Sequence, residues 1–500
     1  MNSREIKRKH VKEKKMAKIN IRILHLNPIY SALVRLFEHI FKRETEPTRQ
    51  NIILLCMSML YLNACPSIRS MFNMYVSART TKSMAAFYKM LGRQKLFIDD
   101  WPFSLLEIIL SKLQILTNLP FLYIIDDTLV EKKGEHFELR CKLFDHTAKN
   151  GSNYLYGHCF VSLVLAIPII FRAKVMYIKL PFAHRMWDKN SKKSKHVLAY
   201  EMILKLDEKI KSKYARVILC DSWYPKGKIL ELHTVHGIPF VCAVRSDTAL
   251  YDMPVTPPQG QRGRKPIRGA KLSKNLDEVF EFQEINGFEY QVSRRRVMTE
   301  IFGSTPCTAY ATRVIETEKN TDIDVDNDSQ EVNSEKNKSN NGINLFIATD
   351  GLDLSNLPVD TLGSDSLTIL VNNDTQFIHF ALYKMRWMIE QCYYDLKIFW
   401  NFEGYRVRSQ KRISALIAIQ TVVYCIMSVI PYIEKIFEPL VDCSPQDRRF
   451  YVGEFLREVE IFGRYVTHLE TSGKSPALKA NCEWYIENQI IFPNNLFSTA

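Results

Sequence analysis

Two short apolar segments of this chain each end in an acidic residue. Residues 122–125 (Leu-Tyr-Ile-Ile) precede Asp126, and residues 217–220 (Val-Ile-Leu-Cys) precede Asp221. We predict both segments to be buried strands of an α/β sheet, in which ligands gather outside the carboxyl ends of the strands. A single Asp at a strand end commonly starts a turn. Two acids in the same pattern favour a cation-binding site.

A third acid lies in a segment predicted to be helical. Its polar residues recur at offsets of 0, 3, 7 and 14 and are Tyr383, Arg386, Glu390 and Lys397. At about 100° per residue these side chains share an arc of roughly 60°. The opposite side is apolar and carries Met385, Met388, Ile389, Cys392, Leu396 and Phe399. We expect the helix to bury this stripe and to present the four polar side chains together. A solvated face with an Arg386–Glu390 pair at i, i+4 spacing has the same pattern.

The order of these blocks resembles a family of bacterial insertion-sequence transposases with an RNase H-like catalytic core. The Tyr-x2-Arg-x3-Glu-x6-Lys spacing of residues 383–397 is similar to the signature of that family. Residues 125–128 (Ile-Asp-Asp-Thr) resemble its first Asp block, and residues 220–224 (Cys-Asp-Ser-Trp-Tyr) resemble its second. Residues 348–355 resemble the strand and loop that lead to the Glu helix. The resemblance covers over half of the chain, from about 126 to 397.

The resemblance implies a DNA transposase that binds the terminal inverted repeats of its transposon. It would catalyse metal-dependent strand cleavage and strand transfer, in cut-and-paste transposition. Asp126, Asp221 and Glu390 would coordinate two Mg²⁺ ions, for which Mn²⁺ could substitute, as in sites where two metals lie about 3.5–4 Å apart. Phosphates near the transposon end would be gripped by Tyr383, Arg386 and Lys397.

Asp126 and Asp127 are adjacent, so either residue could be the first metal ligand. Alternation along a strand sends their side chains to opposite faces, and one of the two is therefore expected to serve. The alignment with the Asp-x-Thr block of the family selects Asp126.

Around these residues we predict an α/β protein. Its RNase H-like core, a mixed sheet flanked by helices, is interrupted by a β-rich insertion and preceded by a helical N-terminal domain. The predicted parts are a basic N-terminal arm (1–45), a helical DNA-binding domain (46–118), the first part of the catalytic core (119–248), the β-rich insertion (249–372) with a disordered loop at 316–341, the second part of the core (373–435) and a helical C-terminal region (436–500).

The insertion carries a run of basic and small residues that resembles a minor-groove hook. Its basic residues are Arg262, Arg264 and Lys265. A flexible turn would have a similar composition. Some relatives stack a flipped base on a Trp of the insertion, but none of the six Trp of this chain lies between 249 and 372. Base flipping onto the insertion is therefore not supported.

The formal net charge of +14 favours a polyanionic partner, although a generically basic soluble enzyme would have the same charge. The expected partner is double-stranded DNA of the transposon ends and the target, with the protein acting as a dimer in the DNA complex. Eleven Cys are scattered without a Cys-x-x-Cys pair, which favours reduced thiols in a bacterial cytoplasm. Residues 413–433 carry no charge, but Gln420 and Pro431 interrupt them, so we expect a buried helix and no membrane partner.

Two other functions fit parts of the pattern. The apolar run followed by Asp126, Asp127 and Thr128 also resembles the nucleophile block of haloacid-dehalogenase-type phosphatases, which form a phospho-aspartate. That function would leave Glu390 and the positive charge without a role. A transposase-derived protein that binds DNA without catalysis would keep the charge, and the complete set of three acids argues against it.

Overall fold

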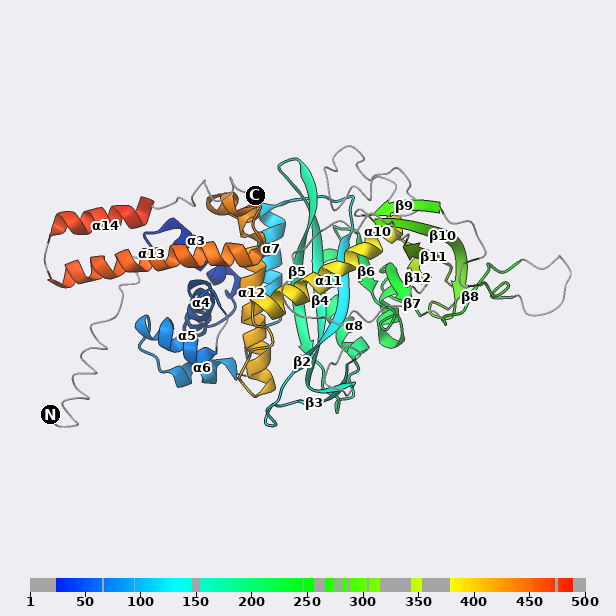
Figure 1. Cartoon of the computed structure of the whole chain (residues 1–500), viewed down its shortest axis with the longest axis horizontal. Coiled ribbons are helices and arrows are strands. Elements are labelled where there is room, and N and C mark those ends of the chain that lie inside the picture. The colour runs from blue at the N-terminus through cyan, green and yellow to red at the C-terminus, as the bar shows by residue number, and fades with distance from the viewer. Residues whose placement is uncertain are drawn as a thin grey trace, which may run out of the picture.

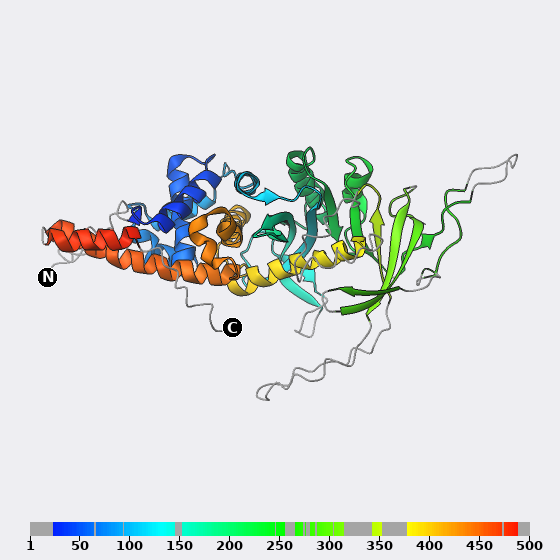
Figure 2. The ribbon, with the colours of Figure 1, turned by 90° about the horizontal axis from the view of Figure 1, so that it is seen from above.

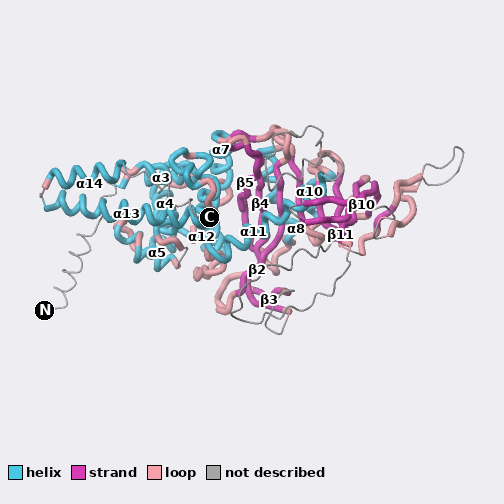
Figure 3. The backbone as a smooth tube through the Cα atoms, turned by 45° about the horizontal axis from the view of Figure 1, so that its top comes forward, coloured by secondary structure: helices cyan, strands magenta, loops and turns pink. Residues whose placement is uncertain are grey.

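The computed structural model is elongated, with helices gathered at one end and strands at the other (Figures 1 and 3). It describes residues 24–64, 67–93, 95–145, 153–245, 247–255, 266–273, 276, 281–285, 288–303, 305–314, 343–352, 378–472 and 475–488.

The helical end is built from both terminal parts of the chain. Its N-terminal helices are α3 (Pro28–Ile40), α4 (Glu46–Tyr61), α5 (Ile68–Met74), α6 (Met84–Leu91) and α7 (Trp101–Lys112). Its C-terminal helices are α12 (Gln410–Ile433), α13 (Pro445–Ser472) and α14 (Pro476–Asn488), of which α13 and α14 project side by side from the body (Figure 2). A buried ion pair between Arg79 and Glu460 joins the two sets. The helices within 46–118 thus share a core with α12 and α13.

Helix α3 differs from the predicted basic arm of residues 1–45. The Asn27 side chain accepts a hydrogen bond from the Tyr30 N–H at 3.0 Å, and a proline occupies the first turn, so the helix begins here. The apolar stripe of α3 is buried and includes Ile29, Leu33, Phe37 and Ile40. This part of the chain therefore belongs to the helical core, and the basic residues at positions 4–18 lie outside the described residues.

The described strands form one mixed sheet of twelve strands in the order β1-β4-β2-β6-β7-β12-β11-β10-β8, with β3 and β5 on β4 and β9 on β10. Their bounds are β1 (Gln114–Ile115), β2 (Phe121–Glu131), β3 (Cys141–Phe144), β4 (Tyr154–Phe171), β5 (Lys174–Met186), β6 (Arg216–Cys220), β7 (Phe240–Val244), β8 (Leu250–Tyr251), β9 (Glu281–Ile285), β10 (Phe288–Thr299), β11 (Cys307–Val314) and β12 (Asn344–Thr349). Strands β2, β4 and β5 are an antiparallel meander, and β6 and β7 run parallel to β2. The mixed α/β class predicted from the sequence is confirmed.

Strands β8 to β12, which come from the predicted insertion, continue the central sheet. Strand β12 pairs antiparallel with β7, with Leu345 opposite Val244, and β11 and β10 follow. The backbone ladder therefore runs from β2, β6 and β7 into β12, β11 and β10 without a break. The predicted loop at 316–341 and the hook residues Arg262, Arg264 and Lys265 lie outside the described residues.

Helices cover both faces of the sheet around β2. One face packs on α8 (Lys195–Ile210) and α12, and the other on α10 (Ile378–Lys384) and α11 (Met388–Tyr394), which cross the strands in Figure 1. Side chains of β2 alternate between these cores. Those facing α8 are Phe121, Tyr123 and Ile125, and those facing α10 and α11 are Leu122 and Ile124.

The segment predicted as one helix up to Phe399 is helical but changes its winding. A 3₁₀ turn (Met385–Trp387) separates α10 from α11, and a π-helical turn (Asp395–Phe399) follows α11. The buried Asp395 accepts a hydrogen bond from the Tyr424 hydroxyl of α12 at 2.8 Å. A tighter turn and a wider turn shift the side-chain directions away from a uniform 100° per residue.

Helix α12 is long and apolar enough to cross a membrane. However, most of it is buried inside the protein, against α4, α13 and β5. The buried core helix predicted for residues 413–433 is therefore confirmed.

Candidate active site

The register of two parallel strands brings the two predicted aspartates together. Ile125 of β2 lies opposite Cys220 of β6, so Asp126 and Asp221 occupy the next position on each chain segment. Neighbouring strands lie about 4.8 Å apart. Strand β6 ends at Cys220 as predicted, but the prediction that β2 ends at Asp126 is wrong. Its pairing with β4 carries β2 on to Glu131.

Both carboxylates face the side of the sheet that α10 and α11 cover. The apolar residues that face these helices are Leu122 and Ile124 of β2 and Val217 and Leu219 of β6. Because side chains alternate along a strand, Asp126 and Asp221 continue these two rows. Asp127 points to the opposite face, toward α8. The two adjacent acids are therefore separated by the sheet, as the sequence predicted.

Arg386 lies between the sheet and Glu390. Its Nη1 atom is 3.4 Å from Asp126 Oδ2 and 3.2 Å from Glu390 Oε1. The Asp126 side chain is 17% exposed and that of Glu390 is 35% exposed, so both lie at the edge of the protein interior. The i, i+4 pair of the helix is present, and the same guanidinium also reaches a carboxylate on a strand. A purely solvated helix face would not make this second contact.

The surroundings of Asp126 and Asp221 raise the pKa of both carboxyl groups. Burial, followed by the negative charges of Asp221 and Glu390, raises the pKa of Asp126 well above its usual range. The Asp127 backbone N–H, which donates to Asp126 Oδ1 at 2.8 Å, and the Arg386 guanidinium act in the opposite direction. Burial also raises the pKa of Asp221. A bound cation would stabilise the ionised carboxylates.

Asp127 has a separate set of partners on the other face. Its Oδ2 atom is 2.6 Å from Lys195 Nζ at the start of α8, and its Oδ1 accepts a hydrogen bond from the Tyr224 hydroxyl at 3.2 Å. The Cys159 thiol also donates to Oδ2 at 3.2 Å. Asp127 is thus a paired anion that ties β2 to α8 and to the loop after β6.

Tyr383 and Lys397 also lie along this face of the sheet. The Tyr383 ring stacks on Phe346 of β12, with ring centroids 5.1 Å apart, and burial raises its pKa to about 12. Lys397 Nζ donates to the Leu129 carbonyl of β2 at 3.0 Å and is 2.9 Å from a Glu403 carboxylate oxygen. Lys397 therefore reaches β2 three residues beyond Asp126, and its ammonium group is engaged by the protein.

The three acids fit a divalent metal by their chemistry. Hard cations such as Mg²⁺ prefer carboxylate oxygens, and Asp126, Asp221 and Glu390 supply them from three elements. A cation, the Arg386 guanidinium, already bridges Asp126 and Glu390. Within the described ranges, no three His, Cys, Asp or Glu side chains converge at metal-ligand distances. Arg386 must therefore give way for Asp126 and Glu390 to share an ion.

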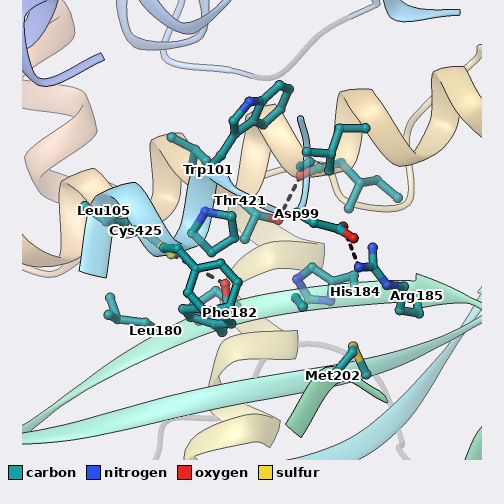
Figure 4. Close-up of a pocket in the computed structure, with 18 of the residues that line it drawn as sticks. Asp99, Trp101, Leu105, Leu180, Phe182, His184, Arg185, Met202, Thr421 and Cys425 are labelled. Carbon is teal, nitrogen blue, oxygen red and sulfur yellow. Dashed lines mark hydrogen bonds and ion pairs between the residues drawn. The ribbon is translucent and has the colours of Figure 1, made fainter. Parts of the chain in front are cut away.

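A separate cavity of about 70 Å³ lies between α7, β5 and α12 (Figure 4). It is lined mainly by apolar side chains, with Asp99 and Arg185 paired at its rim. Burial lowers the pKa of His184 in its wall to about 3, so this imidazole is neutral. Asp126, Asp127, Asp221 and Glu390 do not line this cavity.

Sequence reasoning missed three residues next to the acids. Lys195 follows the Ser194 cap of α8, but its contact with Asp127 depends on how α8 packs under the sheet. Trp223 and Tyr224 belong to the predicted second Asp block without a role of their own, although the Trp223 N–H donates to Asp221 Oδ1 at 3.1 Å. Their closeness to Asp221 in the sequence was the available signal.

A family model described as DDE superfamily endonuclease matches residues 37–286, half of the chain. The chain belongs to this DDE superfamily. A second model, described as a transposase DDE domain, matches residues 188–426 of this DDE protein. The two matched segments together contain Asp126, Asp221 and Glu390, and both matches agree with a DDE transposase.

Comparison of this DDE protein with curated proteins gives no match. Among solved structures, it is similar to the piggyBac transposase synaptic complex with hairpin DNA, determined by cryo-EM. The sequence identity is 12% and the TM-score is 0.35, over 96% of this chain and 86% of that chain.

Proposed function

We propose that this DDE transposase binds the terminal inverted repeats of its element and catalyses metal-dependent DNA strand cleavage and strand transfer. The observation that carries the proposal is the placement of Asp126, Asp221 and Glu390 on the same face of the sheet. Two parallel strands and a helix distant in sequence supply one acid each. Asp126 is favoured over Asp127 as a ligand because Asp127 faces α8 and is paired with Lys195.

The strand order supports an RNase H-like core. Strands β5, β4, β2, β6 and β7 lie in that order, with the first three antiparallel and the last two parallel to β2. The acids then lie on the central strand, on its parallel neighbour and on the helix that crosses them. In this proposal β8 to β12 are the insertion, placed between the second and the third acid in sequence.

The residues of the site have different roles. The three carboxylates would hold Mg²⁺, and the bound metal would supply a polarised nucleophile and stabilise the leaving oxygen. The backbone N–H groups of Asp127 and Trp223 orient the Asp126 and Asp221 side chains by hydrogen bonds of 2.8 and 3.1 Å. Arg386, whose guanidinium lies between Asp126 and Glu390, is placed to donate to a phosphate oxygen. Its planar guanidinium suits that partner.

The test uses DNA that carries the terminal inverted repeats found beside the gene. With Mg²⁺, the wild-type protein is expected to cut this DNA at the repeat boundary, whereas Asp221→Ala binds the repeats without cutting. Glu438→Gln, which removes an exposed carboxylate paired with Arg172, serves as the matched control and keeps wild-type cleavage. Equal cleavage by Asp221→Ala and by the wild type would overturn the catalytic assignment.

DNA binding itself is tested by salt. Contacts to phosphates release counterions, so the affinity for the repeats is expected to fall steeply, by orders of magnitude, between about 50 and 200 mM salt. An affinity that hardly changes over this range would contradict a phosphate-gripping surface. A wild-type protein that hydrolyses a small phosphate ester and ignores DNA would favour the phosphatase alternative.

A further inference from the structure

Trp223 is a large apolar side chain that the fold leaves at the surface next to the acids. Trp223 lies two residues after Asp221 and is 38% exposed, whereas the following Tyr224 is fully buried. The backbone N–H of Trp223 donates to Asp221 Oδ1 at 3.1 Å. The position of the indole is therefore coupled to the position of a catalytic carboxylate.

The Trp223 indole packs against His196 and Tyr224. The His196 ring of α8 stacks on it, with centroids 4.3 Å apart and an interplanar angle of 17°. The Tyr224 ring meets it edge-on at 5.2 Å, and His196 Nε2 lies 3.3 Å from the Trp223 carbonyl oxygen. Two ring contacts and one contact to the Trp223 backbone thus hold the exposed indole in place. An incidental surface side chain would have no need of such support.

Two lysine ammonium groups lie over the Trp223 ring. Lys226 Nζ lies 4.5 Å from the Trp223 ring centroid, and Lys195 Nζ lies 5.2 Å from it. Lys195 is paired with Asp127, whereas Lys226 is exposed and makes no ion pair within the described part of the chain. An aromatic face beside a lysine has the chemistry that binds a nucleotide: the ring stacks on the base and the ammonium contacts the phosphate.

We propose that Trp223 is a stacking platform for an unpaired DNA base beside Asp221, with Lys226 binding the adjacent backbone phosphate. The inference rests on the proposed function, which places DNA at Asp221, and it adds that the strand there presents at least one unpaired base. It differs from the predicted hook, because the platform lies in the segment that follows β6, where its ring packs against the start of α8.

The probe is a fluorescently labelled single strand, dT20, bound in EDTA so that cleavage plays no part. Trp223→Ala is expected to weaken dT20 binding about tenfold or more, because stacking of one base on an aromatic side chain is lost. Trp223→Phe keeps an aromatic face and should stay within about threefold of the wild type. Trp484→Ala removes a Trp that is 64% exposed on α14, and it is expected to bind like the wild type.

Trp223→Leu separates stacking from packing, since it keeps apolar bulk and lacks a ring. The platform is refuted if Trp223→Leu binds dT20 as tightly as Trp223→Phe does, or if Trp223→Ala binds it like the wild type. A 2-aminopurine base within the strand adds a direct reading. Its fluorescence is expected to be quenched by the wild type and by Trp223→Phe, and not by Trp223→Leu.

The two failures are distinguishable. Wild-type protein that cuts terminal-repeat DNA with Mg²⁺ while all Trp223 variants bind dT20 equally would overturn the platform and leave the proposed function standing. Wild-type protein that cuts no DNA overturns the proposed function, and a Trp223-dependent binding of dT20 would then still support the platform as a nucleotide site.

Discussion

Asp126 and Asp221 occupy matching positions on two adjacent parallel strands, each one residue beyond the Ile125–Cys220 pair. Alternation along both strands then sends the two carboxylates to the face crossed by α11, which carries Glu390. The site is thus set by strand register. A shift of one residue in either strand would place its acid on the face of α8.

Ionisation of Asp126 should lower the free energy of unfolding of the metal-free protein. The folded-state pKa of Asp126 is raised above its unfolded value of about 3.9, so its contribution to stability is lost as pH rises from about 4 through the folded pKa. Asp126→Asn cannot ionise at this position and therefore does not lose stability in this way. We expect it to be more stable than the wild type by about 1 kcal/mol or more at pH 8 in EDTA, with a smaller difference near pH 4. Urea unfolding at both pH values measures this, and a difference independent of pH would contradict it.

Divalent metal should stabilise the protein through the same acids. A ligand that binds only the folded state stabilises it by about 2.7 kcal/mol at a concentration 100 times its Kd. Mg²⁺ or Mn²⁺ is expected to raise the Tm of the wild type and of Glu438→Gln. Asp126→Asn, Asp221→Asn and Glu390→Gln should lose most of that increase. An equal increase in all five proteins would mean that the ion binds elsewhere.

Arg386 should act as a tethered cation that competes with metal. Arg386→Gln leaves Asp126 and Glu390 without their shared guanidinium. We expect a loss of about 1–3 kcal/mol of stability in EDTA, together with tighter Mn²⁺ binding and slower DNA cleavage. Calorimetric titration with Mn²⁺ measures the affinity, and Arg172→Gln is the control from an exposed ion pair. Weaker Mn²⁺ binding by Arg386→Gln would contradict competition.

Close packing of β4 against β2 should be sensitive at one glycine. A Cβ on Gly157 would lie 2.0 Å from the Val130 carbonyl oxygen, where β2 continues beyond the acids. Gly157→Ala is expected to destabilise the protein by about 1–3 kcal/mol. Gly134→Ala is the control, because its Cβ would meet only the Phe137 ring, at 3.2 Å. Chemical denaturation compares them, and equal stabilities would show that the strands can separate at low cost.

Local patterns in the sequence predicted the elements that carry the acids. The apolar runs before Asp126 and Asp221 form buried strands, and the segment around Glu390 is helical. Its predicted apolar stripe is buried at Ile389, Cys392 and Leu396, whereas Phe399 at its end is exposed, contrary to the prediction. Hydrophobic periodicity gives this information because the period of a strand or helix depends on neighbours in sequence. The catalytic roles came from the resemblance and are tested only by experiment.

Features that depend on partners distant in sequence were not predicted. The extension of β2 past Asp126 comes from its pairing with β4, and the pairing of Asp127 with Lys195 comes from the packing of α8. Strand β12 pairs with β7 through backbone hydrogen bonds, which the pattern of side chains in the sequence does not predict. The burial of α3 was missed because its basic surroundings dominated the composition of residues 1–45.

The most direct test compares Asp126→Asn with Asp127→Asn. Each is assayed for Mg²⁺-dependent cleavage of a plasmid that carries the terminal repeats, alongside repeat binding in EDTA. Asp126→Asn is expected to bind the repeats and to lose cleavage by at least about a thousandfold, since a metal ligand is removed. Asp127→Asn is expected to retain cleavage with reduced stability, because its partner Lys195 is left unpaired. Cleavage lost in Asp127→Asn and retained in Asp126→Asn would contradict the assignment of the site.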